Sequence, residues 1–234
     1  MNRKIFIPLA LTAVYIVLCA AGIAGLDAEI HGIVFRLAVI AALLYAVTRA
    51  FAGVAKRGIE GAVLAGVLGL GMLAASEVYT FCHIYLLGGG AEDITVAHYS
   101  RPCAYLFFIT AVLPGLLSRK VFQRTVGVVA SVSVLSVFAA VIANAPVLLG
   151  YADLLLAAVC ILPAIVLLTV GGREGKGFAL SLIALCVVDS ANRLLILMGS
   201  GQLWRDIAVS LYPIAYILIC TGLRRLGKTE GRGG

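Results

Sequence analysis

The chain has 234 residues, of which 62% are hydrophobic and 12% are charged, whereas soluble domains are about 45–50% apolar and about 25% charged. A mean hydropathy of +1.10 over the whole length requires several bilayer-spanning segments and excludes a water-soluble globule. The short stretches between apolar segments leave no room for a soluble nucleotide-binding or nuclease domain. We therefore attribute the net charge of +7 to membrane topology and predict no nucleic-acid partner.

Apolar windows follow one another along the chain, each long enough at about 1.5 Å per residue to cross about 30 Å of hydrocarbon. The predicted fold class is all-α: a polytopic membrane helix bundle with eight transmembrane helices, forming a single integral membrane domain over residues 1–234 with a short basic C-terminal tail. The windows are 5–25, 32–52, 61–87, 102–118, 122–143, 151–170, 177–198 and 204–223.

Basic residues favour one side of this predicted bundle, and such residues near span ends are retained in the cytoplasm. Fourteen of the 18 Lys and Arg residues fall on the side of the two termini. Both termini are therefore predicted to be cytoplasmic, in a multi-pass protein of a bacterial inner or cell membrane. Asp153 is expected in an outward-facing loop, and the remaining basic residues lie toward the outer side: Arg36, Arg101, Arg193 and Arg205.

An internal duplication is indicated by two similar segments, Pro-Cys-Ala-Tyr-Leu at 102–106 and Pro-Ile-Ala-Tyr-Ile at 213–217, which are offset by 111 residues. Because each unit would contain four spans, the copies point the same way, as parallel repeats about an axis along the membrane normal. Repeat one covers about 1–118 and repeat two about 119–226. Other matching pairs are Glu77 with Asp189, Thr80 with Asn192, Thr110 with Thr221, and the glycine-rich stretches 88–90 with 199–201.

Small residues are interpreted as packing devices. Glycines at 61, 66, 69 and 71 have the spacing that lets two helices approach closely, and the glycine-rich stretches 88–90 and 199–201 are expected to break helices. The six cysteines show no metal-ligand spacing and are interpreted as apolar packers. We predict no metal site and no cofactor.

Two acids lie inside predicted spans, where a charge costs roughly 2.5–3.5 kcal/mol on insertion scales and usually marks a site. Glu77 and Asp189 both fall in the outer half, where they could flank one cavity. For Asp189 an ion pair with Arg193, one turn further on, competes with a site role beside Asn192. Glu77 has no basic residue within four positions, so it must pair with another helix, meet water or stay protonated.

Further polar side chains gather near the same depth. His83 is six residues past Glu77, so an interfacial position competes with a catalytic one. For Tyr105 and Tyr216, a packing role competes with contact to a ligand. For Arg36 and Arg101, extension of the side chain to the membrane interface competes with binding of a lipid phosphate. Tyr85, Arg36, Arg101 and Tyr212 belong to this neighbourhood, and the candidate substrate-binding residues are Thr80, His83, Tyr105, Asn192, Arg193 and Tyr216.

The pattern resembles the YhhN family of eight-helix membrane proteins, which includes the lysoplasmalogenases. The shared features are a carboxylate late in the third helix, here Ser76-Glu77, one in the seventh, here Val188-Asp189-Ser190, and Tyr216 within 213–216 of the eighth. The family typically has Gly-Asp and Ser-Asp at the two acids, and its histidine–tyrosine pattern in the fourth helix is reduced here to Tyr105.

The resemblance implies hydrolysis of the vinyl-ether bond of a lysoplasmalogen, with a membrane lipid or small amphiphile as substrate. Protonating an enol ether needs an acid and adding water needs a base, so Glu77 is the expected general acid and Asp189 the expected general base. Two alternatives stay open: a proton-coupled transporter of small molecules or lipids, and a non-catalytic membrane sensor or assembly subunit. The oligomeric state, including a homo-oligomer, also stays open.

Overall fold

A computed structural model describes residues 17, 28–57, 61–90, 97–116, 120–170, 172–199, 208 and 211–226. Within these residues the secondary structure is helical, so the predicted all-α class is confirmed. The helices are α2 (Ala28–Arg57), α3 (Gly61–Phe81) continued by a π-helical turn η1 (Cys82–Leu86), α4 (Ala97–Val112) continued by a 3₁₀ turn η2 (Leu113–Leu116), α5 (Lys120–Ile142), α6 (Pro146–Val170), α7 (Arg173–Leu197) and α9 (Tyr212–Leu226).

Five of these helices are long and apolar enough to cross a membrane, as expected for a multi-pass protein. They contain the segments Gly32–Gly53, Gly61–Leu86, Gln123–Ile142, Val147–Thr169 and Gly175–Leu197. The predicted windows 102–118 and 204–223 correspond to the shorter helices α4 and α9. The predicted window 5–25 lies outside the described residues except for Val17.

Helices α4 and α6 each begin five residues before their predicted hydropathy windows. Helix α4 starts at Ala97 and contains Pro102 in its interior, although a proline removes one helical hydrogen-bond donor. Helix α6 starts at Pro146, so Asp153 lies two turns inside a helix and is 6% exposed. The expectation that Asp153 belongs to an outward-facing loop is therefore wrong, because a single acid lowers a hydropathy average without ending a helix.

Two glycines that were predicted to break helices, Gly88 and Gly199, lie just after helix ends. Gly88 follows η1 with φ of 69°, and Gly199 follows α7 with φ of 63°. This left-handed conformation is costly for residues with a Cβ but not for glycine, so both helices end at a glycine. Asn144, with φ of 49°, makes the corresponding turn between α5 and α6, as asparagine tolerates this region better than most residues.

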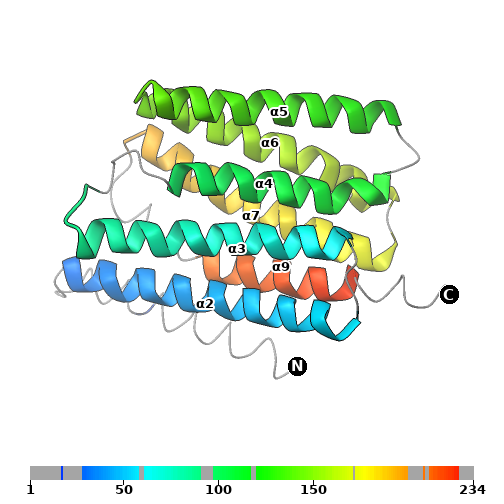
Figure 1. Cartoon of the computed structure of the whole chain (residues 1–234), viewed down its shortest axis with the longest axis horizontal. Coiled ribbons are helices and arrows are strands. Elements are labelled where there is room, and N and C mark those ends of the chain that lie inside the picture. Colours follow the sequence, from blue (N-terminus) through cyan, green and yellow to red (C-terminus); the bar gives the residue numbers. More distant parts are fainter. Residues whose placement is uncertain are drawn as a thin grey trace.

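The helices lie side by side along the long axis of the molecule (Figure 1). Helix α3 packs on α4, and α7 packs on α9. Helix α2 contacts α3 and α9, while α6 contacts α5, α7 and α4. As a result, α4 and α9 each connect the two sequence halves of the bundle, α4 through α6 and α9 through α2.

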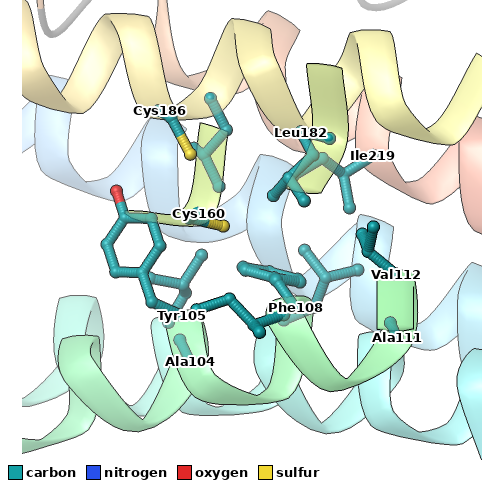
Figure 2. Packing of buried hydrophobic residues seen from close by; sticks show 14 of the residues in the cluster. Ala104, Tyr105, Phe108, Ala111, Val112, Cys160, Leu182, Cys186 and Ile219 are labelled. Atoms are coloured by element: carbon teal, nitrogen blue, oxygen red, sulfur yellow. The ribbon is translucent and has the colours of Figure 1, made fainter. Parts of the chain in front are cut away.

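The buried core is centred on one face of α4. Figure 2 shows Ala104, Tyr105, Phe108, Ala111 and Val112 of α4 facing side chains of α6, α7 and α9. Phe108 and Val112 are fully buried. Three cysteines, interpreted from the sequence as apolar packers, are buried in this core: Cys160, Cys186 and Cys220.

Two of the four glycines in α3 make the predicted close approaches. A Cβ built on Gly69 would lie 2.8 Å from the Phe108 ring and 3.1 Å from the backbone oxygen of Ala104, and one on Gly66 would overlap Leu223. A Cβ on Gly61 or Gly71 would meet nothing within 4 Å. The close contacts of α3 with α4 and α9 therefore depend on Gly69 and Gly66.

Replacing Gly69 with Ala is expected to lower the free energy of unfolding by about 1–3 kcal/mol, the usual cost of overpacking a core. The matched variant Gly71→Ala adds the same methyl group to the same helix in open space and should be neutral or stabilise by up to about 1 kcal/mol. Thermal unfolding of both purified variants in detergent checks this. Equal midpoints for the two would show that the α3–α4 contact tolerates a methyl group.

Candidate functional site

The two intramembrane acids occupy matching places in their helices. Glu77 and Asp189 each lie 16 residues after the first residue of α3 and α7, which is about 24 Å along the axis. Both are buried, with 4% and 6% of their surfaces exposed. They lie toward the end of the bundle at which α3 and α7 terminate and α2, α4 and α9 begin.

Glu77 is held by two arginines from two other helices. Arg36 of α2 donates from Nη1 to Oε2 at 3.1 Å, and Arg101 of α4 donates from Nη2 to Oε1 at 2.9 Å. Of the three alternatives for this acid, the structure shows pairing with other helices. Each carboxylate oxygen accepts a hydrogen bond from a different guanidinium group, so Glu77 is suited to orienting the two arginines.

Asp189 has different partners, which are mainly hydroxyl groups. Tyr105 of α4 donates to Oδ2 at 2.7 Å, and Tyr212 at the start of α9 donates to Oδ1. The guanidinium of Arg101 is further away, with Nη1 3.8 Å from Oδ1. The carboxylate is therefore surrounded by neutral hydrogen-bond donors with one cation at the edge of ion-pair distance.

Arg101 joins the two acids into one cluster, which we call the Arg101 cluster: Arg36, Glu77, Arg101, Tyr105, Asp189 and Tyr212. One nitrogen of Arg101 contacts Glu77 and the other faces Asp189. Its side chain is 17% exposed and that of Arg36 is 29% exposed, so the cluster is buried at the carboxylates and more open at the guanidinium groups.

A separate ion pair lies beside this cluster. Arg193 of α7 donates from Nη2 to Asp153 Oδ2 of α6 at 2.8 Å. Arg193 was expected as the partner of Asp189 or as a substrate-binding residue, and the structure instead pairs it with an acid on the neighbouring helix. Together with the Arg101 cluster, this gives three arginines and three carboxylates, so their charges balance, as burial in a membrane demands.

The other predicted site residues contribute less directly. Tyr216 is 1% exposed and its ring stacks on Tyr212, with centroids 5.7 Å apart. It therefore packs against one of the two tyrosines that donate a hydrogen bond to Asp189. Asn192 is buried beside Asp189 on α7. Thr80 donates to the backbone oxygen of Ser76, a contact within its own helix.

His83 lies in the π-helical turn, away from the contacts that define the Arg101 cluster. Its ring stacks on Tyr79 with centroids 6.2 Å apart and lies against Gly89. Tyr85 of the same turn has its hydroxyl against Gly32 of α2. Both interpretations of His83 therefore stay predictions.

Sequence reasoning named Arg101 and Tyr212 as neighbours but not as the partners of the two acids. A signal was present, since each residue directly precedes the proline of its repeated segment and the two are 111 positions apart. Asp153 was missed because it was assigned to a loop. Among the described residues, no group of three or more His, Cys, Asp or Glu side chains could hold a metal ion.

Comparisons of this chain with protein-family models, with curated proteins and with solved structures find no match. The resemblance to the YhhN family therefore stays a prediction.

Proposed function

We propose that this multi-pass membrane protein is an intramembrane hydrolase of ether lysolipids, similar to the lysoplasmalogenases. The observation that carries the proposal is that Arg101 contacts Glu77 and faces Asp189, while two tyrosine hydroxyls bind Asp189. Two carboxylates with different partners in one buried cluster are suited to acid–base chemistry, because their environments assign them different tasks.

The proposal includes the eight-span architecture built from two parallel four-helix repeats. Arg101 reaches Glu77 on the preceding helix, and Tyr212 reaches Asp189 in the same way. The offsets of these pairs, 111 and 112 residues, match the duplication. The packing of α2 on α9 and of α4 on α6 also supports a two-fold relation, in which each half contributes to one shared site.

The contacts support a change in the roles expected from the sequence. Both oxygens of Glu77 are bound by guanidinium groups, so we assign Glu77 to fixing Arg101. Asp189 is the better group for moving protons because its hydrogen-bond partners are neutral hydroxyls. Tyr105 and Tyr212 orient it, and Arg36, the more exposed arginine, lies where the anionic phosphate of a lysolipid could bind.

The reaction that follows requires Asp189 first to take up a proton from water and then to pass it to the β-carbon of the vinyl ether, which leaves an oxocarbenium ion. Water then forms a C–O bond to that ion and returns its proton to Asp189. The hemiacetal breaks its bond to the glycerol oxygen, which takes up a proton, and a fatty aldehyde leaves. No net proton is consumed, and water supplies the added atoms.

The purified protein, in detergent with added lipid, is expected to release aldehyde from a lysoplasmalogen and none from the saturated-ether analogue. The analogue binds with the same headgroup but has no double bond to protonate, so it is the matched control for substrate. Aldehyde release is measured by a coupled dehydrogenase. A folded protein that releases none would overturn the proposal and make proton-coupled transport the next function to test, by substrate uptake into vesicles with and without a pH gradient.

A further inference from the structure

Two carboxylates, those of Asp189 and Asp153, are near enough to compete for an ion pair with Arg193. Asp189 lies one turn earlier on the same helix, a spacing at which an acid and an arginine can pair, and the two side chains are within electrostatic range. Asp153 lies on the neighbouring helix α6, and the structure pairs Arg193 with this residue at 2.8 Å. The partner that Arg193 takes determines whether Asp189 has a second guanidinium group, besides that of Arg101, in direct contact.

The Asp153 pair leaves part of the arginine unused. The contact runs through Nη2, and Nε of Arg193 is a buried donor with no hydrogen-bond partner among the described residues. A buried, unpartnered donor costs about 1–3 kcal/mol, so Arg193 would gain from meeting another acceptor. Asp189 is the acceptor that its own helix offers, and the competing attraction of Asp153 holds the side chain on α6.

We propose that Asp153 is a positioning residue that holds Arg193 on α6, so that Asp189 keeps its two hydroxyl partners and has only Arg101, at 3.8 Å, within ion-pair distance. This inference rests on the proposed function for its catalytic consequence, because a second guanidinium in direct contact would further oppose the proton uptake that Asp189 needs in the reaction.

Other charged or titratable groups also face Asp189 and are unchanged by the test. Helix α4 presents Arg101 and Tyr105, and α9 presents Tyr212. The groups next nearest to Asp189 and its partners are Tyr216 of α9, Cys186 of α7 and Glu77 of α3. Asp153 is changed in both variants and also lies within electrostatic range of Asp189, so the behaviour of Asp189 reports on Arg193 through the difference between Asp153→Asn and Asp153→Asn/Arg193→Gln.

Replacing Asp153 with Asn is expected to lower kcat for lysoplasmalogen at least tenfold, since Arg193 is freed to turn onto Asp189. Removing that arginine as well, in Asp153→Asn/Arg193→Gln, should restore most of the lost kcat. The conservative variant Asp153→Glu keeps the charge and should retain activity. A double variant no better than Asp153→Asn would mean that the pair serves folding alone and would overturn the proposal.

A second readout does not depend on activity. The infrared carboxyl band of protonated Asp189, identified by its absence in Asp189→Asn, is followed against pH in each protein. In Asp153→Asn its titration midpoint should fall by about 1–3 pH units, the effect of a nearby opposite charge on an acid, and it should return in the double variant. If Asp153→Asn does not fold, Asp153→Ser serves with the same expectation.

The two readouts separate the two proposals. A wild-type protein without hydrolytic activity, whose Asp189 midpoint nevertheless falls in Asp153→Asn, contradicts the hydrolase proposal and supports the positioning role. An active wild-type protein whose midpoint does not move in Asp153→Asn contradicts the positioning role and leaves the hydrolase proposal in place.

Discussion

Replacing Asp189 with Asn is expected to lower kcat for lysoplasmalogen hydrolysis by about 10²–10⁴-fold, the usual contribution of a general acid–base group. The amide has the same size, and its one oxygen can still accept a hydrogen bond from Tyr105 or Tyr212 while its NH2 group faces the other hydroxyl oxygen, but it cannot carry the transferred proton. Initial rates of aldehyde release at saturating substrate measure the effect. The thermal unfolding midpoint of the same sample shows that the loss is chemical.

Glu77→Gln is the matched comparison, because it also neutralises a buried acid at the same depth. Compared with Asp189→Asn, Glu77→Gln is expected to cause a larger loss of stability, since Arg36 and Arg101 each lose a charged partner. It is expected to cause a smaller loss of kcat. Turnover by Asp189→Asn within threefold of the wild-type value would exclude the proposed role of Asp189. A Glu77→Gln variant that is stable but inactive would return the proton-donor role to Glu77.

Replacing Arg101 with Leu is expected to lower the free energy of unfolding by about 3–5 kcal/mol, the cost of leaving a buried charge without its partner. Arg101 contacts Glu77 at 2.9 Å and faces Asp189 at 3.8 Å, so its loss leaves two carboxylates near each other with one guanidinium, that of Arg36, on Glu77. Reversible unfolding in mixed micelles measures the change.

Two variants control for this experiment. Arg124→Leu removes an exposed arginine from α5 and should change stability by less than about 1 kcal/mol, as surface substitutions do. Adding Glu77→Gln to Arg101→Leu should recover part of the loss, because the unpaired negative charge is removed with its partner. If Arg101→Leu and Arg124→Leu were equally stable, the Arg101 cluster would not be a coupled ion network.

The sequence alone predicted much of the helical framework. An apolar window overlaps each of the described helices α2 to α7 and α9, since burial in hydrocarbon imposes the same requirement on every residue of a span. Glycine positions predicted both the close approach at Gly69 and the helix ends at Gly88 and Gly199, because these depend on the missing Cβ. Glu77 and Asp189 were identified as the residues to examine because a charge inside an apolar window is costly wherever the helix packs.

Tertiary structure alone decided which groups those acids meet. Helical spacing made Arg193 a possible ion-pair partner of Asp189. The packing of α7 between α6 and α9 instead pairs Arg193 with Asp153 and places the Tyr212 hydroxyl on Asp189. Arg101 and Arg36 reach Glu77 across separations of 24 and 41 residues. Such pairing depends on the rotation and depth of each helix relative to its neighbours, and these are set by the summed packing of many side chains that no local sequence spacing encodes.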